Sequence, residues 1–319
     1  MNKISMAALK KAIMAVEAER AKQPVALRPD SAQRSILDKN RRASEKMVAG
    51  FLKQAGLDMK KFQALQEQRS AEMERIVAKQ KTDALRRASR QEDTLHSSIA
   101  AQSKALRDLA SKGDVFPNPS YSLDKPFLIW TTPLIPLADS AVVPLGSWAK
   151  FDFKTDAYSG TQKVGFYFYW ANPYGDYAVI NAATFLSATG YMRAHAPWLW
   201  ANVSQVDAYA QFGLWFGWPK DVASTSYATE PLGKVAASGA LGTGPGVDSC
   251  SISAGVSLSK TLFAVPPGND VVFEVTLSLE YYNDSGNIDA DFASGDFKIA
   301  CPVVVLSLLN SVPVVVVES

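Results

Sequence analysis

Two different periodicities of apolar residues divide the chain. From Leu57 to Lys112 there is no proline or glycine, and Ala, Gln, Glu, Lys and Arg, which favour helices, predominate. At 1.5 Å per residue this stretch predicts a helix about 80 Å long. The helix should end at Gly113, because glycine tolerates the left-handed conformation of a helix C-cap. Shorter helices are predicted near Lys3–Lys22 and Ser31–Gln54.

The apolar residues of the long helix form only a thin stripe. Such a stripe suits a helical hairpin or a self-associating coiled coil better than the centre of a large core. The residues predicted to drive oligomerisation are Leu95, Ile99, Leu106 and Leu109, with Met73 and Ile76 upstream. Packing of the helix on the other part of its own chain is the alternative.

From residue 114 onward, strand patterns replace the helical ones. In Val271–Tyr281 every second residue is apolar, which predicts a strand with one buried face. Turn residues separate further candidate strands and no helical segments alternate with them, which favours an antiparallel sandwich or jelly roll. The other predicted strands are Phe127–Trp130, Trp148–Phe153, Lys163–Trp170, Tyr177–Asn181, Phe185–Arg193, Val206–Phe216, Cys250–Leu258 and Phe297–Leu309. The predicted fold is a segregated α+β arrangement, with a helical arm over 1–113 and a β domain over 114–319.

Charge and aromatic residues divide at the same place. Residues 1–113 carry 24 Lys and Arg against 13 Asp and Glu, and the remainder carries 9 against 18. Of the 33 aromatic residues, 31 lie in the second part. The basic part can contact the phosphates of nucleic acid or another polyanion, but it almost lacks aromatic residues that would stack on bases. A solvated surface, or a face that docks on the acidic half, is favoured. The candidate polyanion-binding residues are Arg41, Arg42, Arg86, Arg87 and Arg90.

Motifs of catalysis are absent from the sequence. His96 and His195 have no recognised nucleophile motif nearby, and the chain contains neither Gly-x-Ser-x-Gly nor His-Glu-x-x-His nor a paired-cysteine zinc spacing. We therefore expect a protein that is not an enzyme and that needs no cofactor.

One acidic stretch between predicted strands carries oxygen-bearing side chains at alternate positions. Asn287, Asp289 and Asp291 can surround a hard cation such as calcium. The spacing departs from that of an EF-hand loop and lacks its terminal glutamate. An ordinary polar turn is therefore the favoured interpretation.

Aromatic side chains are the best recognition candidates. The strand Lys163–Trp170 is apolar on both faces, so one face meets the core and the other meets a second subunit, the helical arm or a ligand. Aromatic rings beside Asp and Asn also hold sugar rings in sugar-binding sandwiches. Core packing is favoured for any single tryptophan, followed by a subunit interface and then a sugar platform. The candidates are Tyr167, Tyr169, Trp170, Trp198, Trp200, Trp215 and Trp218.

The compartment is constrained by cysteines and by apolar segments. Cys250 and Cys301 are too few for a disulfide framework, and two buried thiols are favoured over one bridge. The charged N-terminus is unlike a secretory signal peptide. Ile299–Val317 is uncharged, but its prolines and valines favour buried strands over a membrane helix. We expect cytoplasmic synthesis, with any release by lysis or a dedicated export machine.

The leading hypothesis is a non-enzymatic, self-assembling structural or attachment protein, such as a component of a phage or phage-like particle. The arm would drive homo-oligomerisation, and the sandwich would display or recognise a surface glycan, a membrane or a particle. This placement rests on architecture alone. The alternatives are a soluble membrane-inserting toxin, a capsid-like protein whose basic arm binds nucleic acid, and a carbohydrate-binding module.

Overall fold

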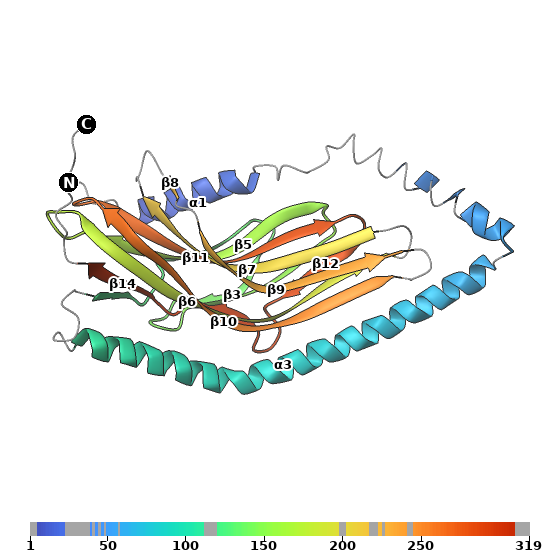
Figure 1. The fold of residues 1–319 in the computed structure, drawn as a ribbon, viewed down its shortest axis with the longest axis horizontal. Coiled ribbons are helices and arrows are strands. Elements are labelled where there is room, and N and C mark those ends of the chain that lie inside the picture. Colours follow the sequence, from blue (N-terminus) through green and yellow to red (C-terminus); the bar gives the residue numbers. More distant parts are fainter. Residues whose placement is uncertain are drawn as a thin grey trace.

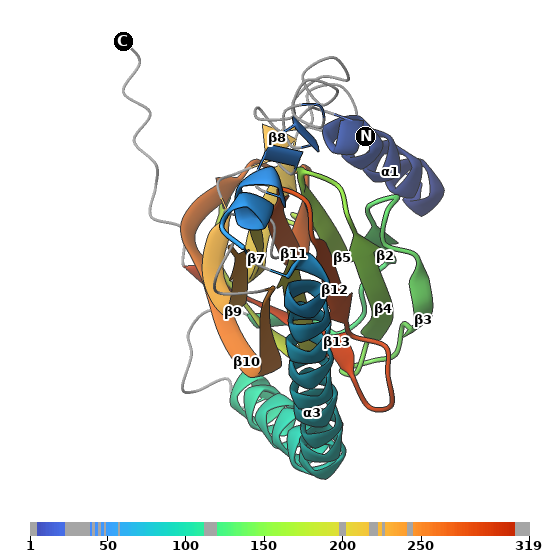
Figure 2. The ribbon, with the colours of Figure 1, turned by 90° about the vertical axis from the view of Figure 1, so that its right-hand side faces the viewer.

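The computed structural model describes residues 5–22, 39, 42–43, 46–47, 49–56, 58–111, 120–197, 202–216, 223–224, 227–240 and 245–309. Its centre is a pair of antiparallel sheets, of eight and six strands, that face each other and confirm the predicted sandwich. The sandwich is elongated, and helices of the same chain lie along it on opposite sides (Figure 1, Figure 2).

The eight-stranded sheet, here sheet A, is built around one long strand, β6 (Ala178–Ala196). One edge of β6 pairs with β10 (Gly246–Val265). Its other edge pairs in succession with β14 (Val304–Leu309), β13 (Lys298–Ala300) and β12 (Asn287–Asp291). The remaining strands of sheet A are β1 (Ser120–Leu123), β3 (Leu137–Ala141) and β4 (Trp148–Thr155).

The six-stranded sheet, here sheet B, has the order β2-β5-β11-β7-β8, and β9 also pairs with β7. Its central strand β11 pairs with β5 on one side and with β7 on the other. The strands are β2 (Leu128–Thr131), β5 (Ser159–Ala171), β7 (Asn202–Phe216), β8 (Ala223–Ser224), β9 (Ala228–Gly239) and β11 (Asp270–Asn283).

The core lies between the inner faces of the two sheets. Alternate residues of each strand point into this core, and many of them are phenylalanines. Phe166 and Phe168 of β5, Phe212 of β7 and Phe151 of β4 all belong to it, and Phe151 stacks on Phe292 with ring centroids 4.8 Å apart. Apolar burial of this extent is the main source of stability in the β domain.

Two sequence predictions for the strands are corrected. The segments Tyr177–Asn181 and Phe185–Arg193 belong to one uninterrupted strand, because residues 182–184 pair with both β10 and β14. Paired neighbours override the weak strand preference of alanine there. The acidic stretch predicted as a turn is partly strand, because Ile288 and Ala290 point into the core and hold β12 in the sheet.

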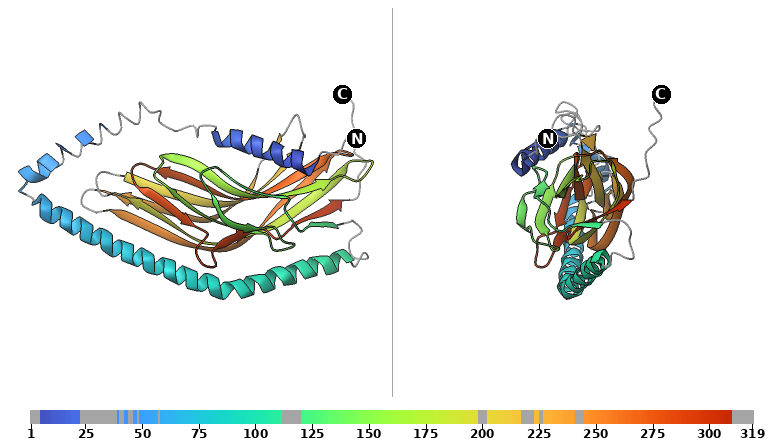
Figure 3. Two further views of the ribbon diagram at one scale, coloured as in Figure 1. Left: turned by 180° about the vertical axis from the view of Figure 1, so that it is seen from behind. Right: turned by 90° about the vertical axis from the view of Figure 1, so that its left-hand side faces the viewer.

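Two helices flank the sandwich, α1 (Met6–Lys22) on sheet B and α3 (Met59–Ser111) on sheet A. The 53 residues of α3 follow the prediction closely, and about 80 Å of helix results. Gly56, with a φ of 77°, ends the preceding helical stretch. The N-terminal part of α3 extends past one end of the strands (Figure 1, Figure 3). Among the described residues, no helix is both long and apolar enough to cross a membrane.

Candidate functional site

The outer face of sheet B is aromatic, and α1 covers it. Leu9 and Ile13 of α1 are buried against Tyr167, Trp215 and Val272, with Trp130 and Tyr169 beside them. The strand residues of this cluster belong to the face of β2, β5, β7 and β11 that points away from the core. The second apolar face of Lys163–Trp170 therefore meets the helical arm of its own chain, one of the three partners that the sequence left open.

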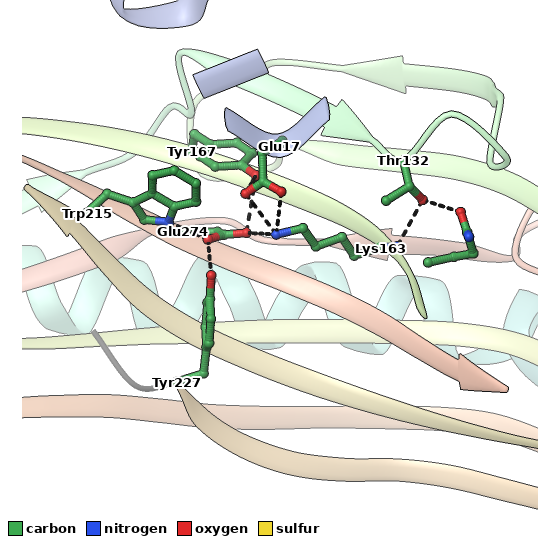
Figure 4. A network of polar contacts seen from close by, with 8 residues as sticks. Glu17, Thr132, Lys163, Tyr167, Trp215, Tyr227 and Glu274 are labelled. Carbon is green, nitrogen blue, oxygen red and sulfur yellow. Dashed lines mark hydrogen bonds and ion pairs between the residues drawn. The ribbon is translucent and has the colours of Figure 1, made fainter. Parts of the chain in front are cut away.

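A buried charged cluster lies under the C-terminal half of α1 (Figure 4). The Lys163 ammonium lies 2.8 Å from Glu17 Oε2 on α1 and 2.7 Å from Glu274 Oε1 on β11. Both glutamates are inaccessible to solvent, at 1% and 0% exposure. Lys163 is thus shared by a carboxylate of the helix and a carboxylate of the sheet.

Neighbouring side chains donate further hydrogen bonds to Glu274. Tyr227 donates a hydrogen bond to Glu274 Oε2 at 2.6 Å, and Trp215 Nε1 donates to the same oxygen. Tyr167 donates to Glu274 Oε1 at 3.2 Å. The ring of Tyr227 lies over Gly213, where a Cβ atom would come within 2.4 Å of it. A side chain at 213 would therefore displace Tyr227 from the carboxylate.

The electrostatics of this cluster favour its charged form. Burial alone would raise the pKa of Glu274, but the Lys163 ammonium and the hydrogen bonds from Tyr227 and Trp215 outweigh it, so the pKa is lowered. Burial opposes the charge on Lys163 as well, and Glu274 and Glu17 reverse this, so the pKa of Lys163 is raised. Burial and both carboxylates raise the pKa of Tyr167 far above its usual value. Tyr167 therefore remains a hydrogen-bond donor.

Sequence reasoning did not single out Glu17, Lys163 or Glu274 as functional residues. The signal available in the sequence was Glu274 itself. It lies on the same face of Val271–Tyr281 as the apolar Val272, the face that was expected to be exposed to solvent. The prediction of one exposed face is wrong, because every residue from Val271 to Leu279 is buried. A buried charge must be paired, and its partners come from β5 and α1.

The outer face of sheet A receives α3 through a mixed polar and apolar contact. Glu74, Val77, Lys81, Ala84 and Ala88 follow one another at steps of three and four, which places them on one side of the helix. Val77, Ala84 and Ala88 are buried with Tyr191 and Phe297. Over residues 74–88, α3 therefore packs on the chain's own sandwich through Val77, Ala84 and Ala88, and the predicted oligomerisation residues Met73 and Ile76 are not part of this cluster.

Two ion pairs accompany this contact. Glu74 pairs with Arg193 of β6, and Lys81 Nζ lies 2.5 Å from Asp291 Oδ2 of β12. Tyr191 adds a hydrogen bond of 3.2 Å to the carbonyl oxygen of Val77. Burial raises the pKa of Asp291, but Lys81, the Ser294 hydroxyl and two backbone N–H groups outweigh it and lower that pKa to about 2.

An open pocket of about 430 Å³ lies beside this contact. Lys154, Asp289 and Arg193 sit side by side on β4, β12 and β6 and line it with Asp156 and Asn287. Asp289 Oδ1 and Arg193 Nε are buried, and neither has a hydrogen-bond partner among the described residues. These two atoms are inaccessible to solvent, so the pocket offers a ligand the other polar atoms of its lining side chains.

The three residues suggested as a cation site lie in two different environments, the pocket and the contact between α3 and sheet A. Asn287, Asp289 and Asp291 do share one face of β12, but Asp291 already binds Lys81 and its own turn at Ser294. Within the described part of the chain, no group of three or more His, Cys, Asp or Glu side chains is placed to hold a metal ion. Positive charge reaches these carboxylates from Lys81, Lys154 and Arg193 instead.

One end of the sandwich exposes aromatic and apolar side chains. The loop after β5 carries Tyr174 and Tyr177, which are 39% and 54% exposed, and Phe216 ends β7 nearby in the sheet order. The hydroxyl groups of Tyr174 and Tyr121 lie 2.5 Å apart. This hydrogen bond holds the loop against β1 and keeps one ring in place.

The remaining sequence candidates are dispersed. Trp170 faces the core, whereas Met73 is half-buried and Ile76 is exposed on α3. Arg42, Arg86, Arg87 and Arg90 are exposed, and Arg87 donates to Ser251 at 3.3 Å. Trp198, Trp200, Trp218 and Arg41 lie outside the described residues, as do the side chains of Leu95, Ile99, Leu106 and Leu109.

Comparisons with known proteins found only distant structural likenesses. No family model and no curated protein matches the chain. The enzymatically active domain of tailspike protein 4 from bacteriophage CBA120 aligns at 9% identity and a TM-score of 0.21, over 60% of this chain and 19% of that one. A carbohydrate-binding module, TmCBM61 in complex with β-1,4-galactotriose, aligns at 11% identity and a TM-score of 0.17, over 47% of this chain and 69% of that one. A structure described as CBM4 aligns at 10% identity and a TM-score of 0.20, over 60% of this chain and 91% of that one. This chain thus spans about a fifth of the tailspike chain. TM-scores this low give no information about the function of this chain.

Proposed function

We propose that this chain is a non-enzymatic assembly and attachment protein. Its copies associate through the exposed flank of α3, and the sandwich end that carries Tyr174 and Tyr177 contacts the target. The helices pack on the outer faces of both sheets, whereas Tyr174 and Tyr177 remain exposed at one end of the sandwich.

The observation that carries the proposal is the exposed apolar flank of α3. Leu65 and Ile76 are 45% and 47% exposed, and their spacing of eleven residues is about three helical turns, so they share one flank. Val77, next to Ile76, already faces the sandwich. The flank therefore remains available beside a docked helix, and the part of α3 that passes the end of the strands can reach another copy (Figure 3).

Absolute mass by light scattering, measured over a range of concentrations, tests the assembly step. We expect a defined oligomer for the wild-type chain and a monomer for Leu65→Asp/Ile76→Asp, with unchanged thermal unfolding of the β domain. Lys79→Asp, which places the same charge at another exposed position of α3, is the matched control and should assemble normally. A monomeric wild-type chain, or an oligomer that survives the double substitution, would contradict the proposal.

A second candidate function is glycan binding in the pocket lined by Lys154, Asp156, Arg193, Asn287 and Asp289. The mixture of carboxylate, amide and cationic side chains in the lining favours it, since sugar hydroxyls both donate and accept hydrogen bonds. The pocket lining is balanced in charge, with two cations and two carboxylates, which suits a neutral polyhydroxylated ligand.

A glycan array probed with the full chain tests this second function. We expect binding that Asp289→Asn and Asn287→Ala each weaken about tenfold or more, which corresponds to the loss of one good hydrogen bond. Glu230→Gln, an exposed acid on β9, is the control and should leave binding unchanged. Absence of binding to every glycan, or equal binding by all variants, would rule out this pocket as a sugar site.

A further inference from the structure

We propose that the aromatic face of sheet B accepts α1 from a second copy of this chain, so that assembled copies exchange their N-terminal helices. This inference rests on the proposed assembly and names the segment that would lock it. In the exchanged form, Glu17 of one copy would complete the cluster of Lys163 and Glu274 in its neighbour.

The contact itself is suited to exchange. α1 attaches through a few residues on one side, Leu9, Ile13 and Glu17, with Val16 partly buried, while Met6 at its first turn and Met14 stay exposed. Most of the stability of a protein helix comes from packing of its apolar face, so the 17 residues of α1 need a surface to dock on. Conversely, sheet B without α1 would expose Tyr167, Trp215 and Val272 together with two buried charges.

The chain connection allows either partner. Residues 23–58 join α1 on sheet B to α3 on the opposite sheet, and residues 23–38 alone can span up to about 50 Å when extended. A single copy favours its own sheet, because a connection of this kind keeps α1 at an effective concentration on the order of millimolar. Where association through α3 brings the sheet B of a second copy within the reach of this connection, the same contacts can form between chains.

Charge gives the dock its specificity. The site needs a carboxylate on the helix opposite Lys163, because the lysine side chain is only 15% exposed and its ammonium is held between Glu17 and Glu274. A helix with a lysine at position 17 would mismatch its own Lys163 but match a neighbour that carries a glutamate at position 163. This complementarity makes exchange between two different variants detectable.

The experiment mixes two full-length variants, Glu17→Lys and Lys163→Glu. In the exchanged complex one site has the wild-type charges and the other has them reversed, so we expect the mixed variants to unfold at a higher temperature than either variant alone. The single-chain double variant Glu17→Lys/Lys163→Glu is the control that shows whether the reversed pair folds. No gain in thermal stability on mixing, while this double variant is folded, would overturn the inference.

A second measurement needs no change at a buried position. Wild-type chains with ¹⁴N and ¹⁵N are unfolded, mixed, refolded and treated with a lysine cross-linker, and Lys10 and Lys11 of α1 are exposed for this purpose. Mixed-isotope cross-links from Lys10 or Lys11 to the sandwich are expected. If the chain forms oligomers but these cross-links are all within one isotope, helix exchange is wrong and assembly through α3 stands. If the chain is monomeric at all concentrations, the proposed assembly fails as well.

Discussion

Glu17 and Glu274, from opposite ends of the chain, hold the same ammonium group, that of Lys163, at 2.8 and 2.7 Å. One carboxylate belongs to a helix and the other to the central strand of sheet B. The lysine between them therefore ties the N-terminal helix to the sandwich by charge as well as by apolar contact.

Removing the shared lysine should be strongly destabilising. Lys163→Met leaves two carboxylates buried without a counter-charge, and we expect a loss of about 3–5 kcal/mol in the free energy of unfolding. Urea denaturation at neutral pH measures it. Lys79→Met, at an exposed position of α3, should change stability by less than about 0.5 kcal/mol. Equal effects of the two substitutions would show that α1 is not held by this cluster.

Acid should weaken the contact between α3 and sheet A. The pKa of Asp291 is lowered to about 2, because hydrogen bonds from Lys81 and from its own turn outweigh burial. A carboxyl group with a lowered pKa stabilises the fold above its unfolded pKa of about 3.9, and this contribution is lost as the pH falls toward 2.

The variant Asp291→Asn measures that contribution. We expect it to cost about 1–2 kcal/mol at neutral pH, after allowance for the partly exposed Lys81, and to flatten the dependence of stability on pH between about 4 and 2. Asp83→Asn removes an exposed pair with Arg86 and serves as the control. An unchanged pH dependence in Asp291→Asn would contradict the assignment.

Gly213 should not tolerate a methyl group. A Cβ atom there would lie 2.4 Å from the ring of Tyr227, which must then move away from Glu274. We expect Gly213→Ala to cost about 1–3 kcal/mol by crowding and loss of this hydrogen bond. Gly175→Ala, where nothing lies within 4 Å, is the matched control. Thermal unfolding compares them, and a stable Gly213→Ala would mean that Tyr227 is not needed where it lies.

The two cysteines should react differently with a thiol reagent. Both are free; Cys301 is fully buried, and burial raises the pKa of its thiol to about 12, whereas Cys250 is partly exposed. Because the thiolate is the reactive form, we expect labelling of Cys250 alone in the folded chain and of both after denaturation. The variant Cys250→Ser should then remain unlabelled when folded. Only a disulfide would leave both residues unreactive after denaturation without a reductant.

The sequence by itself determined the elements of this protein that depend on local pattern. The absence of glycine and proline from Leu57 to Lys112 predicted α3, and the apolar runs at Lys163–Trp170 and Val206–Phe216 predicted β5 and β7. It also required a cover for the second face of Lys163–Trp170. These inferences hold because helix and strand periodicities are properties of neighbouring residues.

Only the tertiary structure decided which surfaces meet. The register between β5 and β11 and the docking of α1 bring Glu17, Lys163 and Glu274 together, and no local pattern relates three residues so distant in sequence. The same reason explains the wrong prediction for Asn287–Asp291. Its alternating polar residues indicated a turn, whereas in the structure it is a strand paired with β4 on one side and β6 on the other. Long-range pairing supplies hydrogen bonds and buries Ile288 and Ala290, and this free energy outweighs local preference.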